Sequence, residues 1–104
     1  MIIDFHTHTF PDKIAAGAVA NLAQASRTQP FTDGTIAALA ASMQKGGIDH
    51  SVNLPVMTTP SQVEKINTSM ISQLESLSAL GILTFGGMHP DFPDYKTELR
   101  RLKK

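Results

Sequence analysis

Hydrophobic and polar residues follow two alternating patterns along the chain. Short runs rich in Ile, Val, Phe and Thr favour β-strands, and longer segments with an apolar residue at every third or fourth position favour amphipathic helices. Strands are predicted at residues 2–8, 48–56 and 82–88. Helices are predicted at 12–26 and 33–45, from 60 up to Gly81, and from 93 onward. Strands that alternate with helices in this way are typical of α/β proteins built from parallel βα units.

Capping residues predict where two of these helices begin. Asp33 is placed to accept hydrogen bonds from the first free amides of the second helix. Thr59 with Gln62 forms a capping-box pattern, and Pro60 takes the first helical position of the third helix.

The last helix is expected to begin after Asp91, which is placed to cap it. The spacing of Tyr95, Leu99 and Leu102 predicts that these residues share one side of the helix. Its final turn is basic, which suits the helix dipole, and we expect that turn to be solvated rather than to form a binding patch.

Composition and charge restrict the class of protein. The chain has 104 residues, which suits one domain, and it has nine basic and nine acidic side chains and no cysteine. A zero formal charge gives no long-range attraction to phosphate backbones or anionic lipid, so we expect neither nucleic-acid nor membrane binding. The first residues lack the basic start of a secretory signal, and no apolar run approaches the roughly 18 residues of a membrane span. A cytoplasmic protein is the expectation.

The most specific chemical signal is the sequence His6-Thr7-His8 in the first strand. Alternate side chains of a strand point to the same side, so both imidazoles are expected together near the carboxyl end of the strand. Binding sites of open α/β folds and of barrels lie at that end. Two neighbouring imidazoles suit a divalent ion such as zinc. The alternative is a pair of polar residues at a strand exit.

Other polar residues are expected near the same end of the sheet. By strict alternation Asp4 lies on the side of the two imidazoles, where it either accepts a hydrogen bond from an imidazole N–H or is satisfied by backbone amides. His89 follows Gly86-Gly87 at the end of the third strand, and parallel strands would place it at the same rim. Asn53, at the end of the second strand, could also line a pocket there.

The sequence around these residues resembles a known family. Residues 3–15, which read Ile-Asp-Phe-His-Thr-His-Thr-Phe-Pro-Asp-Lys-Ile-Ala, resemble the opening of the amidohydrolase superfamily, in its amidohydrolase-2 branch. That branch includes aminocarboxymuconate semialdehyde decarboxylases. Residues 47–56 and 84–91 are similar to its second and third strands. The His-x-His element is shared with TatD-type nucleases and PHP phosphoesterases, a weaker alternative that the neutral charge does not support.

The resemblance implies a TIM (β/α)8 barrel with divalent metal at its C-terminal face. His6 and His8 match the first two metal ligands of the family, and Asp4 could orient one of them. His89 matches a position near the mouth of the site, where it would contact substrate. The family takes its remaining ligands from later strands. A TIM barrel needs roughly 250 residues, so this chain would supply its first three strands.

These implications lead to two expectations of function. The first is that residues 1–104 form the N-terminal part of a metal-dependent hydrolase, with zinc in the intact enzyme and hydrolysis or decarboxylation of a small molecule as its reaction. Two ligands fall short of the three that a catalytic zinc needs, so the chain alone is expected to be inactive. The second is a non-catalytic α/β module that self-associates as a homo-oligomer, or binds a partner, through an exposed sheet edge.

Overall fold

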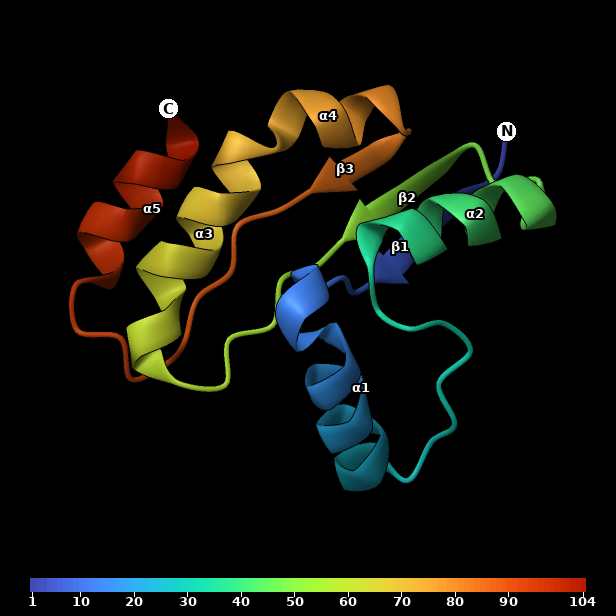
Figure 1. The fold of residues 1–104 in the computed structure, drawn as a ribbon. Helices are drawn as coiled ribbons and strands as arrows, with labels where there is room; N and C mark the ends of the chain where they lie inside the picture. Colours follow the sequence, from blue (N-terminus) through green and yellow to red (C-terminus); the bar gives the residue numbers. More distant parts are fainter.

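The computed structural model describes residues 1–104 and alternates strands with helices (Figure 1). In chain order the elements are β1 (Ile3–Thr7), α1 (Asp12–Ser26), α2 (Ile36–Gly46), β2 (His50–Asn53), the 3-10 turn η1 (Pro60–Gln62), α3 (Val63–Ser72), α4 (Leu74–Ala79), β3 (Ile82–Thr84) and α5 (Tyr95–Lys103).

The three strands form one parallel sheet in the order β1-β2-β3. This arrangement confirms the predicted α/β class with parallel strands, and it is compatible with the predicted βα units. The strands are shorter than predicted. β2 ends at Asn53 because Pro55 follows closely and lacks the N–H that a central strand donates to its neighbours. β3 ends at Thr84, two residues before Gly86-Gly87.

The second helix begins later than predicted. The spacing predicts a start at Asp33, whereas α2 begins at Ile36 and its capping residue is Thr35, whose Oγ1 accepts a hydrogen bond from the amide of Ala38. Asp33 supports that cap instead, because its Oδ1 accepts hydrogen bonds from the amide and the hydroxyl of Thr35. These bonds, of which the side-chain bond is the stronger influence, hold the pKa of Asp33 below its ordinary value.

The third predicted helix is two helices. The capping box of Thr59 and Gln62 is present, but it opens the 3-10 turn η1, and the α-helical segment is interrupted at Gln73. The cause is competition for one carbonyl: the side chains of Ser72 and Gln73 both donate to the carbonyl oxygen of Ser69. The amide of Gln73 bonds to Met70 instead, which tightens the turn between α3 and α4.

Helices cover one face of the sheet. The core on that face is formed by Met43 of α2, Leu77 of α4 and Ile82 of β3, with α2 alongside β1 and β2 in Figure 1. Leu83 and Phe85 neighbour Ile82 and Thr84 in sequence and therefore point to the opposite face. That face, here called the open face, exposes large apolar side chains: Ile3, Phe5, Leu83 and Phe85.

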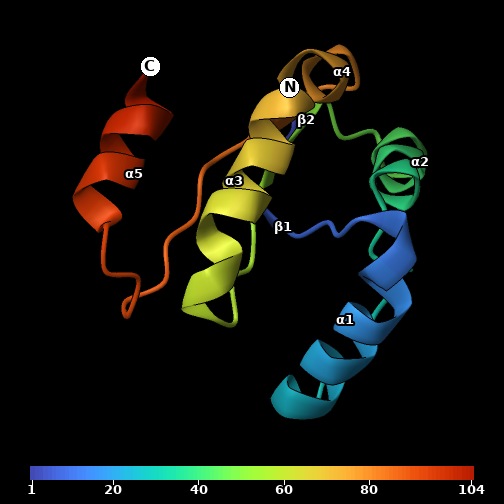
Figure 2. The same cartoon turned by 60° about the vertical axis from the view of Figure 1, so that its left-hand side comes forward.

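The last helix, α5, runs alongside α3 in both Figure 1 and Figure 2. Of the three residues predicted to share one side of this helix, Tyr95 and Leu99 are about half exposed. The buried residue is Glu98, which accepts hydrogen bonds from Asn67 of α3 and from Arg101. Asp91 does not cap the helix, which begins only at Tyr95.

Candidate metal site

The imidazoles of His6 and His8 lie side by side at the carboxyl end of β1. Their Nε2 atoms are 3.1 Å apart, and their ring centroids are 4.9 Å apart with the planes at 85°. Both side chains are exposed. The sequence predicts that these rings share one side of the strand, and the structure brings them into direct contact.

A backbone carbonyl orients the ring of His8 and selects its tautomer. Its Nδ1 lies 2.7 Å from the carbonyl oxygen of Leu54, the residue that follows β2. Because a carbonyl oxygen only accepts hydrogen bonds, Nδ1 is the donor of this bond, so in the neutral ring Nε2 presents the lone pair. Metal-binding histidines in proteins are commonly held in this way, with the second ring nitrogen bonded to a carbonyl or carboxylate.

The separation of the two nitrogens fits a shared metal ion. Two nitrogens that each lie about 2.0–2.1 Å from zinc, at a tetrahedral or octahedral angle, are about 2.9–3.4 Å apart. The Nε2 atoms of His6 and His8 lie within that range. In the absence of metal the same contact is a hydrogen bond in which Nε2–H of His6 donates to Nε2 of His8. Only the proton of His6 must move to its Nδ1 for both lone pairs to face one ion.

A register shift separates Asp4 from the two imidazoles. Asp4 pairs with Ser51 and Thr7 pairs with Asn53, so three steps along β1 match two along β2. Asp4 and Thr7 therefore lie on the helix-covered face, and His6 and His8 lie on the open face. Oδ1 of Asp4 accepts a hydrogen bond from the backbone amide of His6 at 3.1 Å. Of the two roles expected for Asp4, the structure has the hydrogen bond to a backbone amide.

Asn53 joins the ends of all three strands. It is fully buried, and its Oδ1 accepts a hydrogen bond from the hydroxyl of Thr9, which directly follows His8. Its Nδ2 faces Oγ1 of Thr84 at 3.2 Å and Sδ of Met70 at 3.4 Å. Asn53 therefore fixes the segment behind the imidazoles and does not line a pocket. An amide residue at the end of a central strand is the only signal of this role in the sequence.

His89 does not join the imidazole pair. It lies in the loop after β3, where its Nδ1 accepts a hydrogen bond from the amide of Asp91 at 3.1 Å. The chain has no group of three or more His, Asp and Glu side chains placed to hold a metal ion. The preceding glycines serve packing, because a Cβ at Gly86 would meet Leu102 and one at Gly87 would meet Met57. Substrate contact by His89 stays a prediction.

The imidazole pair stands on an open surface and not in an enclosed cavity. A hollow of about 570 Å³ is lined by residues at the start of α1 and α2, by the end of α3 and by the two residues that flank α4, among them Phe10, Ile36 and Met70. Neither His6 nor His8 lines it. The two imidazoles are therefore accessible from the open face.

Comparison with protein-family models, with curated proteins and with solved structures finds no match to the chain. None of the helices is both long and apolar enough to cross a membrane.

Proposed function

We propose that His6 and His8 bind a divalent metal ion, zinc in the first place, and that residues 1–104 form the first three βα units of an amidohydrolase-like TIM barrel. The observation that carries this proposal is the 3.1 Å approach of the two Nε2 atoms, with Nδ1 of His8 anchored to the carbonyl of Leu54. Two histidines that lie near each other on a surface by chance require neither the close contact of their Nε2 atoms nor the hydrogen bond from one ring to a backbone carbonyl.

The arrangement of the sheet supports the barrel. Parallel strands in sequential order are the repeating unit of a (β/α)8 barrel, and the active sites of such barrels lie at the carboxyl ends of the strands. The imidazoles lie at that end of β1. Their face carries the exposed side chains of Phe5, Leu83 and Phe85, as expected of a face that turns inward when further strands close the barrel.

The two imidazoles of the chain would position the ion by donating a nitrogen lone pair each. His8 is held in the correct tautomer by Leu54, and His6 gives up its Nε2 proton to solvent or to its own Nδ1 when it becomes a ligand. A metal ion held there would supply Lewis-acid chemistry: it would polarise a substrate carbonyl and would lower the pKa of water at the site to about 7. That chemistry serves hydrolysis, and the same site would serve a decarboxylation. A catalytic zinc takes about three protein ligands, so activity needs a ligand from outside residues 1–104.

The test is a titration of the isotope-labelled chain with zinc, followed by NMR of the histidine rings. We expect the ring signals of His6 and His8 to shift first and together, while those of His50 do not move. The double variant His6→Ala, His8→Ala should lose these shifts, and both side chains are exposed, so the fold should remain. His89→Gln is the matched control and should behave as the unaltered chain. Zinc shifts of equal size in the double variant would contradict the proposal.

A further inference from the structure

The geometry points to a second metal-dependent state, in which one zinc ion bridges two copies of the chain through His6 and His8 of each. This inference rests on the metal binding proposed above. The new elements are the partner, which is a second copy of the chain, and the four-ligand coordination of zinc that this second copy completes.

The coordination arithmetic favours the bridge. Zinc in proteins is most often tetrahedral with four ligands, and each chain presents two imidazole nitrogens to one point. No third His, Asp or Glu of the same chain is close enough to join them. A second copy contributes the same pair, so two chains supply four nitrogens once the Nε2 proton of each His6 has moved or left. A two-fold axis through the ion satisfies both copies at once.

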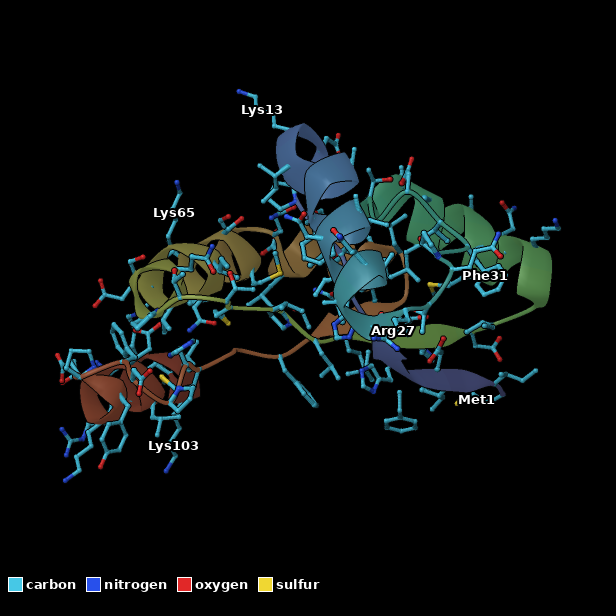
Figure 3. The ribbon with its side chains drawn as sticks, turned by 90° about the horizontal axis from the view of Figure 1, so that it is seen from below. Met1, Lys13, Arg27, Phe31, Lys65 and Lys103 are labelled. Atoms are coloured by element: carbon cyan, nitrogen blue, oxygen red, sulfur yellow. The ribbon has the colours of Figure 1, made fainter.

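The surroundings of the imidazoles allow a second copy to approach. β1 is an edge strand of the sheet, and Figure 3 shows it, in dark blue after Met1, at the outer margin of the molecule. Phe5 is 70% exposed and directly precedes His6 on the open face, and Phe85 is 58% exposed on the same face. Apolar side chains of this size on the same face as the two imidazoles add contact area that water would otherwise cover.

The bridged state has a chemical consequence. Structural zinc sites have four protein ligands, whereas catalytic sites keep one position open for water. A zinc ion held by four imidazoles has no position for water or substrate, so the bridged pair is an association site. Bridging therefore competes with any further ligand that would complete a catalytic site on one chain.

Sedimentation velocity of the 104-residue chain, with and without zinc, tests the inference. We expect a monomer in EDTA and a doubling of the mass with zinc, saturating at one ion per two chains, and reversed by EDTA. Substitution of cobalt(II) for zinc should give the intense visible absorption of a tetrahedral site. A chain that binds zinc one to one and stays monomeric would overturn the bridge and leave the proposed function standing. A chain whose imidazole signals ignore zinc would overturn both.

Two variants separate metal binding from association. His6→Ala should remove the zinc-dependent dimer, while His89→Gln should retain it. Phe5→Lys places a charge beside the imidazoles without touching them, so its His6 and His8 ring signals should still shift with zinc while the dimer weakens at least severalfold. A Phe5→Lys chain that dimerises as readily as the unaltered chain would show that the interface does not lie on the open face.

Discussion

Asn67 of α3 donates from its Nδ2 to Oε1 of Glu98 in α5, over 2.8 Å. Asn67 is fully buried and Glu98 is only 3% exposed. The same amide group is also bonded to Gly87 in both directions, through its Nδ2 and its Oδ1. One side chain therefore holds α5 and the loop after β3 against α3, which explains why a carboxylate and not Leu99 forms the inner side of the last helix.

Replacement of Asn67 by Ala should destabilise the fold. The change leaves the amide and the carbonyl of Gly87 without their partner, while Oε1 of Glu98 keeps its hydrogen bond from Arg101. Each buried polar group left unpaired costs about 1–3 kcal/mol. We expect the free energy of unfolding in urea to fall by about 2–4 kcal/mol. Asn21→Ala, at an exposed position of α1, is the matched control and should change it by less than about 0.5 kcal/mol. Equal effects of the two variants would show that the Asn67 contacts do not hold α5.

Glu98 should make stability depend on pH in the acid range. Hydrogen bonds from Arg101, opposed by burial and helped by Asn67, hold the pKa of Glu98 below its ordinary value of 4.5. The unfolded chain therefore takes up this proton at a higher pH than the folded chain does. The stabilisation is complete above the unfolded pKa and is lost as the pH falls through the lower, folded pKa.

The comparison that isolates this group is between the unaltered chain and Glu98→Gln, whose other carboxylates are the same. The difference between their free energies of unfolding should shrink as the pH falls from about 6 to about 3. Urea titrations at several pH values measure it. If the difference in free energy of unfolding between the two chains stays constant over that range, groups other than Glu98 cause the loss of stability in acid.

Asn53→Ala should weaken both the fold and the metal site. The substitution removes the acceptor of the Thr9 hydroxyl and the amide that faces Thr84, at a cost of about 1–3 kcal/mol. Thr9 directly follows His8, so the imidazole should become less well positioned and the zinc-dependent ring shifts should saturate at a higher zinc concentration. The control is again Asn21→Ala. An Asn53→Ala chain with unchanged zinc titration would show that the anchor at Leu54 is sufficient to place His8.

The type and order of the main elements could be predicted because apolar spacing differs between strands and helices. The residues at which these elements begin and end could not be predicted, because they depend on which of several polar groups forms a given hydrogen bond. Asp33 and Thr35 are both good capping residues, and only the structure shows that the hydroxyl of Thr35 takes the amide of Ala38. The apolar spacing runs unbroken from α3 into α4, and the interruption arises from the side chain of Gln73.

In the candidate site, too, the local features could be predicted from the sequence and the long-range contacts could not. The pairing of His6 with His8 follows from alternation along one strand, which is local, and the structure has the two rings in contact. The position of Asp4 depends on the register between β1 and β2, and one extra residue in β1 moves it to the other face. No pattern within β1 alone reveals that shift. The anchor of His8 likewise comes from Leu54, a residue far along the chain.

Two glycines of this chain should respond to alanine in opposite directions. Gly81, between α4 and β3, has a φ of +76°, and a Cβ there would lie 2.6 Å from the carbonyl oxygen of Asp49. Gly81→Ala should therefore lower the free energy of unfolding by at least about 1–2 kcal/mol, through the left-handed backbone alone.

Gly17 lies within α1, and a Cβ there meets nothing within 4 Å. Gly17→Ala should raise it by about 0.5–1 kcal/mol, since alanine favours the helix. Urea unfolding of both variants measures the two changes. A neutral Gly81→Ala would mean that the turn between α4 and β3 differs from the one described, and with it the entry of β3 into the sheet.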